Sequence, residues 1–153
     1  MIQSVEPLIQ EHPFFSDLSA SHLKFISSSA HRVEFLEGHY IFREGDPAKE
    51  FYVICDGLVA VELFVPGVGA TTLQTVGEGE VLGWSWLTPP YRWHFRAKAL
   101  QRTRAFVIDT DTLCAKCEED HDLGYELLRR FATVIAARLD ATRLQLLDIY
   151  ASS

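Results

Sequence analysis

The stretch EGHYIFREGDPAKEFYVICDGLVAVELFV, residues 37–65, decides the fold. It is rich in β-branched and aromatic residues, which favour extended backbone. Turn signals interrupt it at short intervals, at Glu37-Gly38, at residues 44–47 and at Asp56-Gly57. Many short strands separated by such turns predict an antiparallel barrel or sandwich. The glycine-rich residues 65–70 join two of these strands, so they predict a hairpin rather than a phosphate-binding loop.

Helical patterns flank this stretch on both sides. On the N-terminal side, Ser19 is suited to cap a short helix that begins at Ala20 and ends in the polar residues 27–29. On the C-terminal side, strand character returns at residues 93–99 and 103–108, and the apolar spacing then becomes helical. The sequence predicts one α+β domain over residues 1–153, with helices at about 5–30, strands at about 31–109 and helices at about 111–150.

The last helix, predicted from about residue 123 to residue 149, has an unusually broad apolar stripe. Residues such as Leu128, Phe131, Ile135 and Leu139 recur at spacings of three or four, and further apolar residues widen the stripe. A stripe wider than one sheet can cover indicates a second partner, so we expect a homodimer through this helix. One helix packed on the strands with a generous apolar face is the alternative.

Composition excludes several classes of protein. The chain has 153 residues, of which 48% are hydrophobic and 23% charged, which is typical of a globular domain. A net charge of −7 without a basic tail argues against holding a nucleic-acid backbone. Three cysteines do not make a disulfide framework, and neither a signal peptide nor an apolar run of about 18 residues is visible. We expect a cytoplasmic protein with no membrane or direct DNA contact.

Three segments in succession resemble the cyclic-nucleotide-binding domain of the bacterial catabolite-activator and fumarate-nitrate regulator superfamily. They are residues 12–19, 37–47 and 51–59. The resemblance implies an antiparallel β-roll, that is, a jelly-roll-like double-stranded β-helix, with short N-terminal helices and a long C-terminal helix that forms a dimer interface. Regulators of that superfamily carry a helix-turn-helix domain after the long helix. Because this chain stops at Ser153, we expect a stand-alone domain.

The resemblance also locates a ligand site, and there the sequence departs from the family. In the family, a glycine and a glutamate open a short helix over the cyclic phosphate, and an arginine further along pairs with that phosphate. Here Gly83 matches the glycine, Trp84 stands at the place of the glutamate, and Tyr91 stands at the place of the arginine, with Arg92 beside it. A tryptophan side chain has no acceptor for a ribose hydroxyl, so we do not expect ordinary cAMP or cGMP binding. Thr142, on the long helix, matches a threonine that reaches the base across the dimer.

All three tryptophans and two further aromatic residues lie in this altered cassette. They could stack on a flat organic ligand, or they could fill the roll as ordinary core. The candidate ligand-binding residues are Gly83, Trp84, Ser85, Trp86, Tyr91, Arg92, Trp93, Arg96 and Thr142. No cofactor is identified. Cys114 and Cys117 form a lone Cys-x-x-Cys pair, too few ligands for a zinc site.

Three functions follow from these observations. The first is a non-catalytic sensor domain whose small ligand is not ordinary cAMP or cGMP, or whose ligand binding has been lost. The second is a degenerate cyclic-nucleotide-binding fold that acts as a dimerisation or protein-interaction module. The third is cyclic nucleotide binding through a cassette shifted by one residue, with Arg92 on the phosphate. No arrangement of residues typical of catalysis is present, so we expect no enzyme activity.

Overall fold

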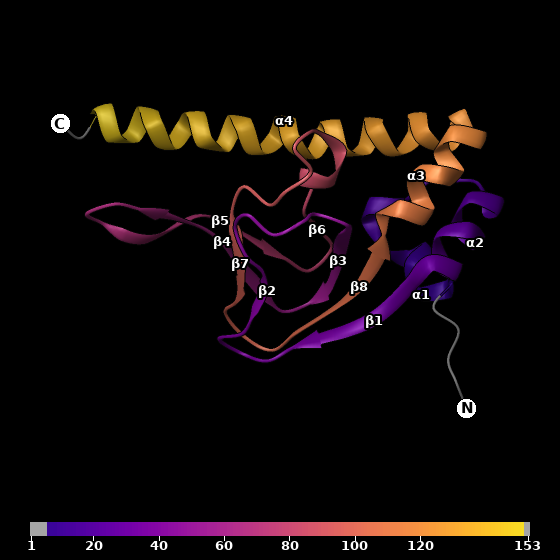
Figure 1. The fold of residues 1–153 in the computed structure, drawn as a ribbon, viewed down its shortest axis with the longest axis horizontal. Coiled ribbons are helices and arrows are strands. Elements are labelled where there is room, and N and C mark those ends of the chain that lie inside the picture. Colours follow the sequence, from indigo (N-terminus) through magenta and orange to yellow (C-terminus); the bar gives the residue numbers. More distant parts are fainter. Residues whose placement is uncertain (1–5, 152–153) are drawn as a thin grey trace.

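Eight strands form two antiparallel four-stranded sheets that enclose a roll, seen in a computed structural model that describes residues 6–151 (Figure 1). The first sheet has the order β1 (Ala30–Phe35), β8 (Thr103–Asp109), β3 (Glu50–Asp56) and β6 (Val81–Leu82). The second has the order β2 (Tyr40–Phe42), β7 (Arg96–Ala99), β4 (Leu58–Val65) and β5 (Gly69–Gly77). The antiparallel architecture predicted from the turn spacing is confirmed, and so is the β-roll that the family resemblance implies.

Alternation along β3 divides the apolar residues between two cores. Tyr52 and Ile54 face the space between the two sheets, where they pack with Val59 and Val76. Their neighbours in sequence face the opposite side of the first sheet, where Phe51 packs against the helices. The first sheet is therefore covered on both faces, and the helices lie on its outer face.

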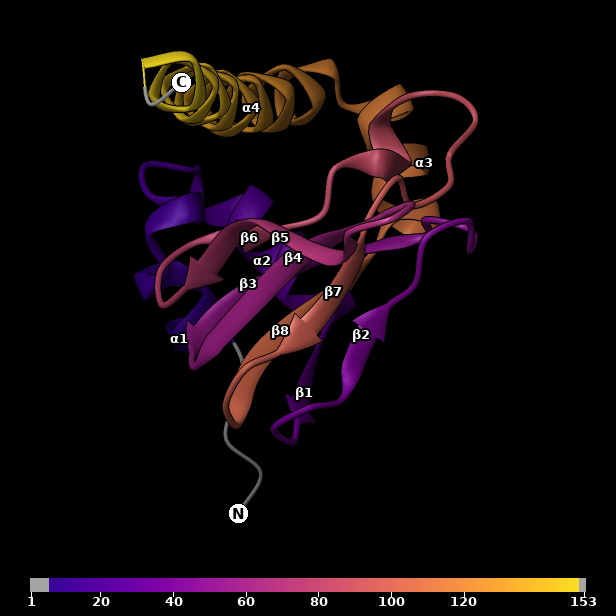
Figure 2. The same cartoon turned by 90° about the vertical axis from the view of Figure 1, so that its left-hand side faces the viewer.

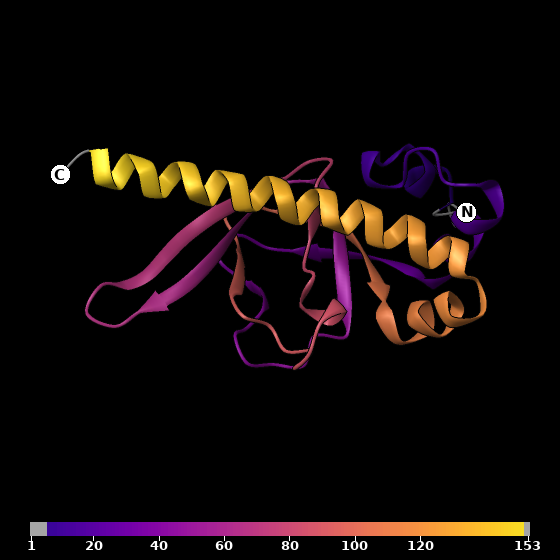
Figure 3. The ribbon, with the colours of Figure 1, turned by 90° about the horizontal axis from the view of Figure 1, so that it is seen from above.

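Short helical segments at the N-terminus close one end of that outer face. They are α1 (Glu6–Glu11), η1 (Pro13–Phe15) and α2 (Ala20–Ser29). The predicted cap is confirmed, because the Ser19 hydroxyl accepts a hydrogen bond from the backbone N–H of His22 at 3.3 Å. Two views show these helices gathered beside α3 (Thr110–Glu119) at one end of the roll (Figures 1 and 3).

The long helix α4 (His121–Ala151) crosses the roll and continues beyond it (Figures 1 and 3). It begins two residues before the predicted start, because the Asp120 carboxylate accepts from the backbone N–H of Leu123 at 3.3 Å. Near its C-terminus the Gln145 side chain donates to the Leu73 carbonyl of β5, in the predicted hairpin, at 3.3 Å.

The apolar stripe of α4 is only partly covered by the roll. Leu123, Leu127 and Phe131 are buried against it. A second set of large apolar side chains on α4 is exposed, comprising Tyr125, Leu128, Leu139, Leu144, Leu146, Leu147, Ile149 and Tyr150. The stripe is therefore broader than the roll requires, as its sequence predicts.

The strand expected from Trp93 begins only at Arg96. The preceding residues instead pair with the turn after β2, where the Trp93 N–H donates to the Asp46 carbonyl at 3.0 Å and Pro47 forms an isolated bridge with Arg92. Figure 2 shows β2, β7 and β4 side by side, with this loop rising from them towards α4. The loop thus places its aromatic residues at the mouth of the roll.

Candidate functional site

Gly83 forms the first element of the cassette, directly after β6. Its backbone is left-handed, with φ +97°, a conformation that disfavours any side chain. A Cβ at this position would lie 2.7 Å from the ring of Trp93. Glycine is therefore required twice here, once by the backbone and once by the ring that packs on it. The chain then continues into η2 (Ser85–Leu87).

Trp93 closes the mouth of the roll. Its ring stacks on Phe42 of β2, with centroids 3.7 Å apart and planes 9° from parallel. Only 5% of the residue is exposed. Backbone hydrogen bonds to the 45–46 turn fix it on both sides, since the Gly45 N–H donates to the Trp93 carbonyl at 2.9 Å. This tryptophan packs as a core residue.

Trp84 lies beneath an arginine from the long helix. The Arg138 guanidinium carbon is 4.7 Å from the centroid of the Trp84 ring, a cation–π distance. The same guanidinium donates a hydrogen bond to the Val81 carbonyl. Burial lowers the pKa of Arg138, and the charge of Glu80 partly offsets that effect. An arginine of α4 therefore occupies the top of the roll pocket.

These side chains leave almost no free space in the roll. The remaining cavity has a volume of about 20 Å³, close to the room that one water molecule needs. Its lining comprises Phe42, Val61, Leu82, Gly83, Trp84, Ser85, Trp93, Phe95 and Arg138. Pockets for small organic ligands typically measure about 300–1,000 Å³. The cavity as it stands therefore holds no nucleotide.

The structure brings together four of the nine candidate residues, namely Gly83, Trp84, Ser85 and Trp93. Trp86 turns away from the cavity, and its ring stacks on Phe51 at 5.6 Å and meets Phe131 edge-on at 5.3 Å. Its indole N–H is buried without a partner among the described residues.

The remaining four candidates lie outside the cavity. Tyr91 is half exposed, and the exposed Arg92 donates to the Gly45 carbonyl at 2.8 Å. Arg96 faces outward from β7 and pairs with Glu62 at 3.1 Å. The hydroxyl of Thr142, on the exposed part of α4, donates to the carbonyl one turn back at 2.9 Å.

Sequence reasoning missed Arg138 as a member of the site. The available signal was its place one helical turn before Thr142, which the family resemblance had singled out. Helical spacing puts both residues on one face, but it does not say that Arg138 would enter the roll. That depends on where α4 crosses the strands, which no local pattern encodes.

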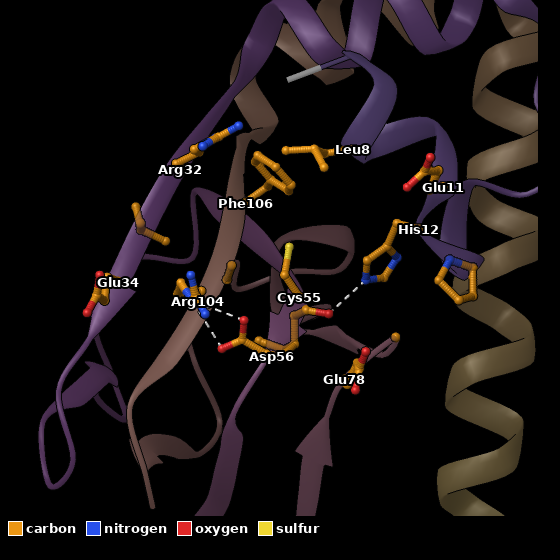
Figure 4. Close-up of a pocket in the computed structure, with 15 residues that line it drawn as sticks. Leu8, Glu11, His12, Arg32, Glu34, Cys55, Asp56, Glu78, Arg104 and Phe106 are labelled. Atoms are coloured by element: carbon orange, nitrogen blue, oxygen red, sulfur yellow. Dashed lines mark hydrogen bonds and ion pairs between the residues drawn. The ribbon is translucent and has the colours of Figure 1, made fainter. Parts of the chain in front are cut away.

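A much larger cavity lies elsewhere, between the N-terminal helices and the outer face of the first sheet. Its volume is about 850 Å³. Figure 4 shows Leu8, Glu11 and His12 on the helical side, with Arg32, Arg104 and Phe106 on the strands opposite. Cys55 lies on its floor. We call this cavity the α1 groove.

His12 anchors the helical wall of the α1 groove to the sheet. Its Nε2 lies 3.0 Å from the Ile54 carbonyl, while its Nδ1 accepts from the backbone N–H of Phe14 at 3.2 Å. This pattern needs a neutral ring with its proton on Nε2. Desolvation lowers the pKa of His12, and the hydrogen bond to Ile54 opposes that shift.

Cys55, on the floor of the groove, is a protonated thiol. Burial raises its pKa, and the charge of Asp56 adds to the rise, while Arg32 and Arg104 oppose it. Among residues 6–151, no three His, Cys, Asp or Glu side chains are grouped as a metal site would require. No helix in the same range combines the length and apolar character needed to cross a membrane.

Comparison with known proteins agrees with this architecture. The chain is 24% identical over 145 residues to a CRP-like cAMP-activated global transcriptional regulator of Mycobacterium tuberculosis, covering 95% of this chain and 63% of the regulator's length.

Solved structures show the same fold. A cyclic nucleotide-binding domain from Methylobacillus flagellatus matches with a TM-score of 0.83 at 21% identity, over 96% of this chain and 86% of that one. A candidate cyclic nucleotide-binding protein from Geobacter metallireducens GS-15 matches with a TM-score of 0.77 at 27% identity, over 91% and 99% of the two chains. The model of the cyclic nucleotide-binding domain family matches residues 32–120. The chain therefore belongs to the cyclic nucleotide-binding domain family.

Proposed function

We propose that the chain is a non-catalytic regulatory domain that pairs with a second copy through α4 and does not hold cAMP or cGMP in its roll. The observation that carries this proposal is the filled pocket. Trp84, Trp93 and Arg138 leave about 20 Å³ where a ligand would need several hundred. A single domain over residues 1–153 and a cytoplasmic location belong to the same proposal.

The arrangement of the phosphate cassette supports the loss of ordinary nucleotide binding. Trp84 offers no acceptor for a ribose hydroxyl, and its ring lies under Arg138. Arg92, which a shifted cassette would need on the phosphate, is instead bound to the Gly45 carbonyl at the surface. A nucleotide would therefore have to break both contacts before it gained its own.

A ligand titration tests this proposal directly. All three tryptophans lie within residues 84–93, so a ligand entering the roll should change their emission. We expect cAMP and cGMP at millimolar concentration to leave both tryptophan emission and melting temperature unchanged. The Mycobacterium regulator named above is the positive control. A rise in melting temperature that saturates with either nucleotide would refute the proposal, because a ligand at 100 times its Kd stabilises by about 2.7 kcal/mol.

The position of Arg138 favours a second function, that of a sensor for a different small ligand. Arg138 is a half-buried cation that reaches into the roll from a helix whose far half lies on the surface. A planar ligand that displaced it could stack on Trp84 and would move α4 at the same time. Such a ligand should bind Arg138→Ala more tightly than the unmodified chain, and a small-metabolite screen by tryptophan emission on both proteins would find it.

The exposed apolar face of α4 supports the dimer. Several large apolar side chains exposed on one helix are typical of a protein–protein interface. Light scattering should give twice the 17.3 kDa chain mass at micromolar concentration. Leu139→Glu with Leu146→Glu should restore the monomer, whereas Val68→Glu, in the exposed β4–β5 turn, should not. A monomer in the unmodified protein would refute the pairing.

A further inference from the structure

The α1 groove combines the size of a binding site with an unusual set of charges. Its volume of about 850 Å³ falls in the range of ligand-binding pockets, and it is separate from the roll pocket. Two guanidinium groups line it, from Arg32 and Arg104. The carboxylates of Glu11, Glu34, Asp56 and Glu78 outnumber them. The groove is therefore acidic on balance.

Most polar groups of the groove are already engaged within the protein. Arg104 pairs with Asp56 at 3.0 Å, and Glu34 pairs with Arg102. Both ring nitrogens of His12 have partners, and the thiol of Cys55 is held protonated. These groups form walls and floor, and they leave no set of donors suited to an anion or a metal ion.

Two carboxylates are exceptions. Glu11 ends α1, and Glu78 lies in the turn between β5 and β6, so they reach the groove from different elements (Figure 4). Both residues are exposed. Within residues 6–151, no hydrogen bond or ion pair engages either side chain. They present unpaired negative charge at two places along the groove.

Apolar side chains also line the groove. Leu8 lies on the helical side, with Phe106 on the strand facing it (Figure 4). Pro13, in η1, also lines the groove. Leu8 is 38% exposed, among the exposed large apolar residues of the described chain. An occupant must therefore combine positive charge with apolar groups.

We propose that the α1 groove binds a basic peptide segment of a partner protein. Lysine or arginine side chains of the segment pair with Glu11 and Glu78, and an apolar side chain between them packs on Leu8 and Pro13. Since the groove offers two unpaired carboxylates and apolar side chains, an occupant that engages all of them carries at least two cations and an apolar group. A peptide of alternating basic and apolar residues satisfies this pattern, whereas a single small cation satisfies only half of it.

A labelled model peptide tests the proposal. The probe is a fluorescein-labelled Lys-Leu-Lys-Leu-Lys, measured by anisotropy at about 0.15 M salt, where long-range attraction is largely screened. Backbone ¹⁵N shifts should change at Leu8, Glu11, Cys55 and Glu78, and the probe Glu-Leu-Glu-Leu-Glu should not bind. We expect Glu11→Gln with Glu78→Gln to raise the Kd of the basic probe about tenfold or more.

The matched control is Glu118→Gln with Glu119→Gln, which removes the same charge from exposed positions on α3, outside the groove. It should leave the Kd within about twofold, because a distant surface charge contributes little at this salt. The proposal is overturned if both double variants weaken binding equally, or if the shifts map outside the groove. The thermal melting of each variant confirms that it is folded before binding is measured.

Discussion

The mouth of the roll and the α1 groove differ in how their side chains use the space that the backbone provides. In the roll, Trp93 and Trp84 are large rings, and Arg138 from α4 completes the closure, leaving about 20 Å³. In the groove, small groups such as Cys55 and Ala105 face about 850 Å³ of open volume. The roll is therefore closed by the volume of its side chains, whereas the groove is a space left open between the helices and the first sheet.

The two regions also differ in what holds them together. The roll mouth is stabilised by ring stacking and close packing, so its residues contribute mainly to the free energy of unfolding. The groove is bordered by exposed charges and one anchoring histidine, so its residues should contribute mainly to binding. The changes below test whether roll-mouth residues contribute mainly to stability and groove residues mainly to binding.

The largest effect is expected from Trp93→Ala. It removes a ring that is 5% exposed and stacked on Phe42 at 3.7 Å. Large-to-small changes of this kind cost about 3–5 kcal/mol, because a cavity replaces the lost contacts. Urea denaturation followed by circular dichroism measures the change. A cost below about 1 kcal/mol would mean that the ring is not part of the core and that the roll can open.

Gly83→Ala should destabilise the protein by a smaller amount. The left-handed backbone alone, at φ +97°, costs a residue with a side chain about 1–3 kcal/mol. The new methyl would also press on the Trp93 ring at 2.7 Å. In the Trp93→Ala background that second contribution disappears, so the two changes should be non-additive. Simple additivity would contradict the packing of the ring on Gly83. Gly67→Ala, left-handed but in open space, is the control.

The same residues show how far the sequence predicts the molecule. Local signals predicted most strands and one helix cap, since Ser19 caps α2 and residues 65–70 turn between β4 and β5 as predicted, but β7 begins at Arg96 rather than at Trp93. They did not predict that Trp84 would line the small roll cavity while Trp86, two residues away, would turn from it. A short 3₁₀ turn between them sends one ring towards Arg138 and the other towards Phe51.

The α1 groove was not predicted at all. Its lining comes from α1 and the start of η1, from β1, β3 and β8, and from the β5–β6 turn, which are distant in sequence. No spacing rule brings Glu11 and Glu78 to one surface. Sequence patterns encode elements and their buried faces, whereas the volume left between elements depends on how they dock.

Lowering the pH should weaken the wall of the groove while leaving the roll mouth intact. Burial lowers the pKa of His12 from its ordinary value of 6.5. The His12 ring therefore takes up a proton more readily in the unfolded chain than in the folded one. Its full contribution to the free energy of unfolding is present above pH 6.5. It is lost as the pH falls through 6.5 towards the lower folded-state pKa.

The measurement is the free energy of unfolding between pH 7.5 and about 5, above the range in which the carboxylates with lowered pKa values titrate. The unmodified protein should lose stability over this range, and His12→Gln should show a flatter profile. His39→Gln, at an exposed position, should retain the slope of the unmodified protein. If the free energy of unfolding changed equally with pH in all three proteins, His12 would not be the source of the pH dependence.

The smallest effect on stability is expected from Leu8→Ser, and it separates the two regions most directly. Leu8 is 38% exposed on the groove rim, so losing its partial burial should cost about 1 kcal/mol or less. The same change removes an apolar contact that the groove offers beside its unpaired carboxylates, so the Kd for the basic probe should rise several-fold. Trp93→Ala should do the reverse, with a large loss of stability and, under conditions where it remains folded, an unchanged Kd. If Leu8→Ser leaves the Kd unchanged, the groove binds by charge alone and its apolar rim has no part in recognition.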